Sequence, residues 1–243
     1  MKILAIGDIH LKPEILYVAD EAINKYSPDR IILLGDYVDD WGATSDMNAY
    51  ERTMDRLMRF ATDHPDAIWL WGNHDISYLD DRCSNCSGHS PIAQTILPSL
   101  FNRLERNTNG FKFVHYKDGI FFSHGGICSA WTRGFSGKIS DFEALADWIN
   151  ESSMSDMWDN ISPLWYRPNT DFPPFANNGV IQIAGHTPAK RIAHWKNMYF
   201  IDTFSTYRDG KPIGTEDFLL YDTTKKEALC VNSKDLTLSP VQD

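Results

Sequence analysis

The stretch "KILAIGDIH" (residues 2–10) decides the fold, because a short apolar run ends abruptly in Gly7, Asp8 and His10. Four more apolar runs end in the same way: "RIILLGD" (30–36), "AIWLWGNHD" (67–75), "GIFFSHGG" (119–126) and "VIQIAGHT" (180–187). Continuous apolar runs of this length are typical of strands that are covered on both faces. One polar ending is an ordinary turn, but the repetition indicates that these strands share a functional edge.

Two segments between the first three runs have the periodicity of amphipathic helices. Residues 13–29 place most of their apolar side chains on one helical face and stop at Ser27-Pro28, and residues 46–65 do the same with Pro65 as the breaker. Strands that alternate with helices predict right-handed crossovers and a parallel sheet. Because ligands bind beyond the carboxyl ends of such strands, we expect the polar endings to meet at one edge.

The second half of the chain is less regular. A helix is expected over residues 140–152, with a capping box from Ser140 to Glu143. Residues 157–179 are rich in proline and aromatic side chains and are interpreted as an ordered loop over the active-site edge. Three later segments are expected to be antiparallel strands that complete a second sheet: "MYFID" (198–202), "FLLYD" (218–222) and "ALCVN" (228–232).

Length and charge limit the possible functions. The 243 residues fit a single α/β domain over residues 1–243. With 23 basic and 33 acidic side chains the formal charge is −10, which disfavours an extended nucleic-acid surface but leaves room for a local basic pocket. No apolar run approaches the roughly 20 residues that span a bilayer, and the N-terminus lacks signal-peptide features, so a cytoplasmic protein is expected. Composition does not specify the oligomeric state.

Four cysteines are too few for a disulfide framework at this size. The segment "CSNCSGH" contains Cys83, Cys86 and His89, which could form a redox pair or part of a zinc site. No second pair with zinc-site spacing follows, so a polar loop with reduced thiols is the favoured interpretation. Cys128 and Cys230 lie in apolar surroundings and are expected to be small core residues.

The predicted edge collects side chains that bind hard and borderline metals. They are Asp8, His10, Asp36, Asn73, His124 and His186. Oxygen and imidazole ligands without a thiolate suit Mn²⁺, Fe, Zn²⁺, Ni²⁺ or Mg²⁺. Asp8 and His10 are two residues apart, so on an extended segment both point to one side, and Asp36 could bridge two cations. Each motif alone could be a turn cap, but all six together favour a metal site.

Five motifs, in this order, resemble those of the calcineurin-like metallophosphoesterases. They are "GDIH" (7–10), "GDYVDD" (35–40), "GNHD" (72–75), "HGG" (124–126) and "GHT" (185–187). Together with "IDT" (201–203), they are most similar to the phosphoprotein-phosphatase branch, which includes bacterial and phage members and diadenosine tetraphosphatases. The resemblance implies a four-layer α/β/β/α sandwich of two mixed sheets flanked by helices.

The resemblance also implies a dinuclear metal site. Asp8, His10 and Asp36 would bind the first metal, and Asp36 would bridge to a second metal bound by Asn73, His124 and His186. Two divalent ions are expected, with manganese favoured over iron, zinc, nickel or magnesium. Water or hydroxide activated by these metals would attack phosphorus.

Three further residues receive roles from the resemblance. His74 would donate a proton to the leaving oxygen and Asp39 would orient its imidazole. Arg167, within "PLWYRP", is the candidate clamp for the substrate phosphate, because guanidinium can bind two phosphoryl oxygens. The alternative for His74 is a surface histidine in a turn. The alternative for Arg167 is a surface arginine stacked on a neighbouring aromatic ring.

The expected activity is hydrolysis of phosphomonoesters, in phosphoproteins or nucleotides. A phosphodiesterase or dinucleoside polyphosphate hydrolase is the alternative, and a non-catalytic metal-binding scaffold is an alternative of another class. The branch usually has Asp-Arg-Gly where this chain has Asp39-Asp40-Trp41, so a phosphate-binding arginine is replaced by a carboxylate. Four aromatic residues could stack on a nucleobase or an aryl leaving group, or could pack the loop: Trp41, Trp165, Tyr166 and Phe172.

Overall fold

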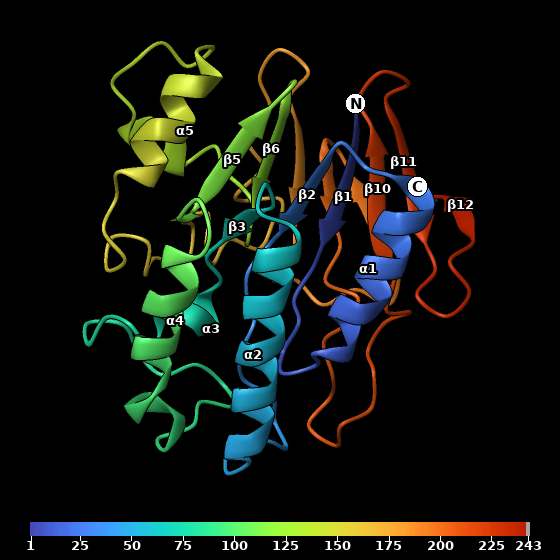
Figure 1. Ribbon diagram of the computed structural model, residues 1–243. Coiled ribbons are helices and arrows are strands. Elements are labelled where there is room, and N and C mark those ends of the chain that lie inside the picture. Colours follow the sequence, from blue (N-terminus) through green and yellow to red (C-terminus); the bar gives the residue numbers. More distant parts are fainter. Residues whose placement is uncertain (242–243) are drawn as a thin grey trace.

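Two mixed β-sheets form the centre of the computed structural model, which describes residues 1–241 (Figure 1). In spatial order, the seven-stranded sheet contains β12 (Leu238–Pro240), β11 (Glu227–Val231), β10 (Phe218–Asp222), β1 (Lys2–Ile6), β2 (Arg30–Leu33), β3 (Ile68–Leu70) and β4 (Phe111–Lys112). The five-stranded sheet contains β5 (Val114–Lys117), β6 (Ile120–Ser123), β7 (Ile181–Ala184), β9 (Met198–Phe200) and β8 (Ala193–Trp195).

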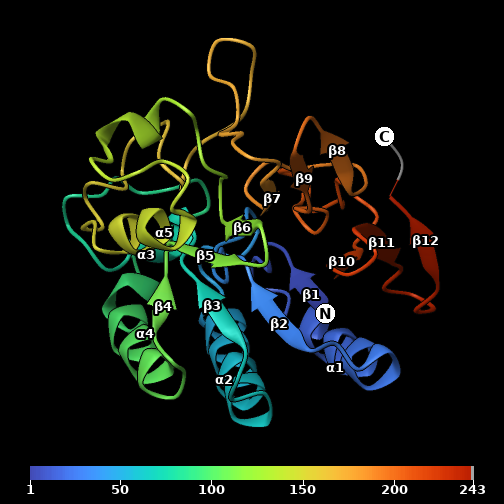
Figure 2. The same cartoon turned by 90° about the horizontal axis from the view of Figure 1, so that it is seen from above.

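The parallel half of the seven-stranded sheet agrees with the prediction. Strands β1 to β4 are parallel neighbours. The helices α1 (Glu14–Tyr26), α2 (Met47–Asp63) and α4 (Leu97–Arg106) lie on one face of this sheet, as Figure 2 shows. Their apolar stripes pack on the buried side chains of the strands, such as Leu33 and Trp69. Each buried side chain of this size stabilises the fold by about 1.5–3 kcal/mol.

Helix boundaries follow from local chemistry. Helix α1 ends at Ser27, which adopts a left-handed conformation before Pro28, and α2 begins after Asp46, whose carboxylate accepts the N–H of Ala49 (3.2 Å). The expected capping box at Ser140 is wrong. The helix α5 (Phe142–Asn150) starts one residue later, because Asp141 accepts the N–H of Ala144 at 3.1 Å. Both residues are good N-caps, and the carboxylate is the one used.

The second sheet faces the first across an apolar layer. Ile3 and Ile32 of the first sheet pack against Phe122 and Ile183 of the second. The neighbouring Phe121 points to the opposite face, where α5 and residues 157–179 cover the sheet. Helices, two sheets and this outer layer therefore form the expected four-layer α/β/β/α sandwich.

The strand assignment near the C-terminus needs a correction. Strand β9 joins the second sheet as expected, but it is parallel to β7 and antiparallel only to β8. Strands β10 and β11 instead extend the first sheet, with Leu220 of β10 opposite Leu4 of β1. β10 and β11 form an antiparallel hairpin, and the strand pattern does not specify which sheet the hairpin joins. Which sheet accepts the hairpin depends on the free edge of β1, which local sequence does not reveal.

Short elements complete the described chain. They are the one-turn helix α3 (Asn73–Ile76), η1 (Ala93–Thr95) and η2 (Trp131–Gly134). Among the helices of residues 1–241, none combines the length and apolar character that crossing a bilayer requires.

Candidate active site

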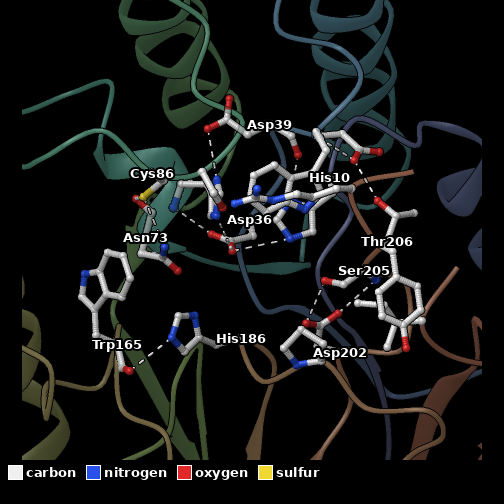
Figure 3. A pocket seen from close by; sticks show the side chains of 18 of the residues that line it. His10, Asp36, Asp39, Asn73, Cys86, Trp165, His186, Asp202, Ser205 and Thr206 are labelled. Carbon is white, nitrogen blue, oxygen red and sulfur yellow. Dashed lines mark hydrogen bonds and ion pairs between the residues drawn. The ribbon is translucent and has the colours of Figure 1, made fainter. Parts of the chain in front are cut away.

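The six predicted donor residues meet at the edge formed by the ends of β1, β2, β3, β6 and β7. Figure 3 shows His10, Asp36, Asn73 and His186 around the cavity at this edge. The first donor group contains Asp8, His10 and Asp36, and the second contains Asp36, His124 and His186. Within each group the potential ligand atoms lie within 4.8 Å of one another. Asp36 belongs to both groups, so its carboxylate lies between two places where a cation could bind.

Asn73 adjoins the second donor group. Its Oδ1 lies 2.8 Å from Nε2 of His124, and the same imidazole nitrogen lies 3.2 Å from Oδ2 of Asp36. The other nitrogen of His124, Nδ1, lies 2.8 Å from the carbonyl oxygen of Leu34. The imidazole of His124 is thus fixed by the main chain at Nδ1, and its Nε2 points toward Asn73 and the shared carboxylate.

Several residues of this edge have left-handed backbone conformations that are unusual for residues other than glycine. His10, Leu11, Asp36, Asp39 and His186 have φ angles of 45°, 58°, 51°, 69° and 60°. Such conformations cost about 1–3 kcal/mol each and cluster at functional sites. The turns after β1, β2 and β7 therefore hold their side chains inward at the expense of stability.

Asp75 offsets part of this strain in the turn after β2. Its buried carboxylate accepts the main-chain N–H groups of Asp36, Tyr37 and Gly72, each at 2.9 Å. Gly72 is the residue before α3, so the contact with its N–H caps that helix. The same carboxylate also ties that helix to the turn that carries Asp36.

Two glycines allow the side chains to crowd together. A Cβ atom added at Gly72 would overlap Asp36, and one added at Gly185 would overlap the carboxylate of Asp8. Glycine is needed at both positions because the main chain passes directly against a donor residue.

His74, which is half-buried, and the buried Asp39 form a hydrogen-bonded pair beside the donor groups. Nδ1 of His74 lies 3.0 Å from Oδ2 of Asp39, and Nε2 lies 4.0 Å from Oδ2 of Asp36. The other carboxylate oxygen of Asp39 accepts the hydroxyl groups of Tyr50 and Tyr78. Burial alone would lower the pKa of His74, but the charges of Asp36 and Asp39 raise it above its usual value. This arrangement can orient a protonated imidazole toward the cavity.

The electrostatics of the donor groups fit divalent cations. Burial raises the pKa of Asp8 well above its usual range, and the nearby Asp202 adds to the effect. Burial would also raise the pKa of Asp36, but His124 and His74 hold it well below its usual range. Burial would lower the pKa of His124, whereas Asp36 and Asp8 raise it to about 9. The buried carboxylates need a balancing positive charge, and a bound cation would replace the proton on His124.

Arg167 lies in the wall of the same cavity. Its Nη1 donates to the carbonyl oxygen of His186 at 2.8 Å, which fixes the guanidinium next to the second donor group. The segment that carries Arg167 is anchored by Tyr166, a buried residue whose hydroxyl donates to the carbonyl oxygen of Phe172 at 2.7 Å. A guanidinium in this position can reach a phosphoryl group bound at the donor residues.

The cavity has a volume of about 580 Å³ and extends beyond the donor groups. Trp41 and Trp165 line it, whereas Phe172 lines a separate hollow and Tyr166 is buried in the core. Two of the four aromatic residues considered for stacking are therefore available to a ligand in this cavity.

Asp202 and Ser205 are site residues that sequence reasoning did not assign. Asp202 is buried next to the first donor group and accepts the hydroxyl of Ser205 at 2.9 Å. Figure 3 shows this pair at the opposite side of the cavity from Asn73. The sequence contains a signal for Asp202, because "IDT" (201–203) comes directly after β9, just as the other polar motifs come directly after their strands.

The cysteine segment does not form a metal cluster. Within residues 1–241, the groups that could bind a metal contain neither Cys83 nor Cys86. Cys83 is buried, His89 stacks on Tyr78 with ring centres 4.3 Å apart, and all cysteines are free thiols.

Cys86 instead contacts the site, because its Sγ lies 3.3 Å from Nδ2 of Asn73. Burial raises the pKa of Cys83 to about 11 and that of Cys86 further, so both remain protonated. Cys128 is a core residue as expected, but Cys230 is only half-buried.

A sandwich of two mixed sheets, with carboxylates and imidazoles gathered at one strand edge, defines the class of metal-dependent phosphoesterases. The sequence matches the calcineurin-like phosphoesterase family over residues 1–216, so the chain belongs to this family. A search of curated proteins gave no match. The protein is accordingly a phosphoric ester hydrolase of the metallophosphoesterase type.

Comparison with solved structures found similar chains. One is a cold-active protein-tyrosine phosphatase from the psychrophile Shewanella sp., with 18% identity, a TM-score of 0.62 and coverage of 99% of this chain and 80% of that one. Another is Yfce, a phosphoesterase from E. coli, with 14% identity, a TM-score of 0.48 and coverage of 98% and 96%. At 18% identity, the similarity to the Shewanella phosphatase concerns the fold alone.

Proposed function

We propose that this protein is a dinuclear-metal phosphatase that hydrolyses phosphomonoesters. The observation that carries the proposal is that two donor groups share Asp36. Nε2 of His74, which Asp39 orients, lies 4.0 Å from Oδ2 of that shared carboxylate. Asp8, His10 and Asp36 would hold one divalent ion. Asp36, Asn73, His124 and His186 would hold the other.

Bound there, the two ions would polarise the phosphoryl group and make a water molecule nucleophilic at neutral pH. The donor set supports manganese, with iron, zinc, nickel or magnesium as alternatives. A family that acts on phosphoric esters and a fold shared with a phosphatase support a phosphorylated substrate, either a phosphoprotein or a nucleotide. We also propose a cytoplasmic location, on the sequence features described above.

The protein's own side chains would bind the substrate and transfer the proton. Arg167, held by the His186 carbonyl, would bind phosphoryl oxygens that project from the donor groups. His74 would protonate the oxygen of the leaving alcohol through Nε2, which faces the shared carboxylate. Asp39 would hold the proton on Nδ1, so that the imidazole keeps the required orientation. An alkoxide leaves poorly, and this proton transfer removes that barrier.

A diesterase or dinucleoside polyphosphate hydrolase is the alternative within the family, and a non-catalytic scaffold is the alternative outside enzymes. The complete donor set argues against a scaffold. The test is turnover of p-nitrophenyl phosphate and bis-p-nitrophenyl phosphate by Mn²⁺-loaded protein, before and after chelation. We expect faster hydrolysis of the monoester and loss of activity with chelator. Faster hydrolysis of the diester would support the first alternative, and no turnover of either would support the second.

A further inference from the structure

Trp41 and Arg208 form a flat surface in the wall of the active-site cavity, which we call the Trp41–Arg208 platform. The guanidinium carbon of Arg208 lies 4.6 Å from the centre of the Trp41 ring. Both side chains line the same cavity as His74 and Asp36. Both also remain exposed, with 38% of Trp41 accessible to solvent. The stacking holds the long arginine side chain in place, so less conformational entropy is lost when a ligand binds.

The positive charge of Arg208 lies over the Trp41 ring. Among residues 1–241 Arg208 forms no ion pair, and the adjacent Asp209 pairs with Lys211 at 2.9 Å. Asp40 accepts the hydroxyl of Thr206 at 2.8 Å and lies 3.7 Å from Nζ of Lys12. A guanidinium that lines a cavity without an acidic partner is available to a ligand.

The two cavity arginines differ in what surrounds them. Arg167 adjoins His186 and therefore the phosphoryl position, whereas Arg208 lies on Trp41 and next to Tyr207, which is 52% exposed. A cavity of about 580 Å³ is much larger than a phosphate group, so the remaining space is available to the leaving group. Asp40, which also lines the cavity, would repel a second phosphate there.

We propose that the Trp41–Arg208 platform binds the leaving group of the substrate and favours a planar aromatic ring, so that aryl phosphomonoesters are preferred. The proposal rests on the proposed function, because it assumes that the phosphoryl group binds at the donor residues. Indole and guanidinium surfaces stack well on a flat π-system. A saturated leaving group of similar size offers no flat face and gains less from the platform.

Binding of stable substrate analogues tests the platform directly. Calorimetry on Mn²⁺-loaded protein should show phenylphosphonate binding about 10-fold tighter than cyclohexylphosphonate, a contribution in the range expected for one stacked ring. Trp41→Leu and Arg208→Gln should each remove most of this difference. Lys211→Gln is the matched control, because Lys211 lies on the same turn, is exposed and does not line the cavity. Equal affinities in the wild type, or an unchanged difference in both platform variants, would overturn the proposal.

Turnover separates failure of the platform from failure of the proposed function. Peptides of one sequence with phosphotyrosine or phosphoserine should give a selectivity ratio of kcat/KM that falls about 10-fold in Trp41→Leu. If the wild type hydrolyses both peptides and the ratio is unchanged in the variant, the platform proposal is wrong and the phosphatase proposal stands. If no phosphomonoester is hydrolysed, the proposed function itself fails. A loss in Arg208→Gln that affects methylenediphosphonate more than phenylphosphonate would indicate a second anion site and would also overturn the platform proposal.

Discussion

The edges of the two sheets contribute differently to the site. From tight turns directly after β1, β2 and β3, the seven-stranded sheet supplies the first donor group, Asn73 and the His74–Asp39 pair. The five-stranded sheet supplies the imidazoles of His124 and His186 after β6 and β7 and the carboxylate of Asp202 after β9. The long connections that follow β6 and β9 supply Arg167 and Arg208. The difference suggests a division of work. The edge of the seven-stranded sheet, which we call the first edge, would hold the carboxylate shared by both metals and the proton on His74. The edge of the five-stranded sheet, the second edge, would complete one metal position and shape the substrate cavity.

The strongest test of this division compares Asp36 with His186. Asp36→Asn removes the charge that both donor groups share, so we expect the protein to lose both metals and turnover to fall by more than about 10³-fold. His186→Ala affects one group, so one metal should remain. Elemental analysis after gel filtration measures the metal content. Equal loss of both metals in the two variants would contradict the division.

His74 should act on the proton and not on the metals. His74→Ala removes the imidazole that Asp39 orients, so turnover should fall by about 10²–10⁴-fold, the range for a general acid. Metal content should equal that of the wild type in the same elemental analysis. Loss of metal in this variant would mean that His74 belongs to the donor set and that its assigned role is wrong.

The pH dependence of kcat should change in Asp39→Asn. The carboxylates of Asp36 and Asp39 raise the pKa of His74 against the effect of burial, so the wild-type imidazole stays protonated to higher pH. Without the Asp39 charge the pKa falls, and the alkaline limb of the pH profile should move to lower pH. Turnover at neutral pH should fall by roughly 10-fold. An alkaline limb that stays in place or moves upward would contradict this account of the pair.

The smallest expected effect concerns Cys86, which contacts the donor residue Asn73. Its thiol accepts from Nδ2 of Asn73 and so directs Oδ1 toward His124. Cys86→Ala should weaken the second metal position by about 10-fold, as loss of an outer contact to a ligand typically does. Cys86→Ser is the matched control and should restore most of the affinity. Mn²⁺ titration monitored by calorimetry would measure the change, and equal affinities in all three proteins would exclude the role.

The regular half of the molecule was predictable because its signals are local. Apolar runs and helical periodicity specify β1, α1, β2, α2 and β3, and a parallel sheet then brings their polar endings together. The donor residues could be chosen for the same reason. The position of the β10–β11 hairpin could not be predicted, since it depends on which sheet edge is free.

The rest of the site depends on contacts between distant segments. The carboxylate of Asp75 reaches main-chain groups 38 and 39 residues earlier in the chain, and the Trp41–Arg208 platform joins two turns far apart in sequence. Neither contact has a periodic signature. Asp202 was predictable in part. The sequence indicates that it follows a strand, but not that it lies close to Asp8.

Electron paramagnetic resonance of the Mn²⁺-saturated protein, together with elemental analysis, tests whether Asp36 bridges two cations. The account predicts two manganese ions per chain and an exchange-coupled spectrum, because both donor groups use one carboxylate. Asp36→Asn should abolish the coupling. A single uncoupled Mn²⁺ per chain in the wild-type protein would contradict a shared dinuclear centre.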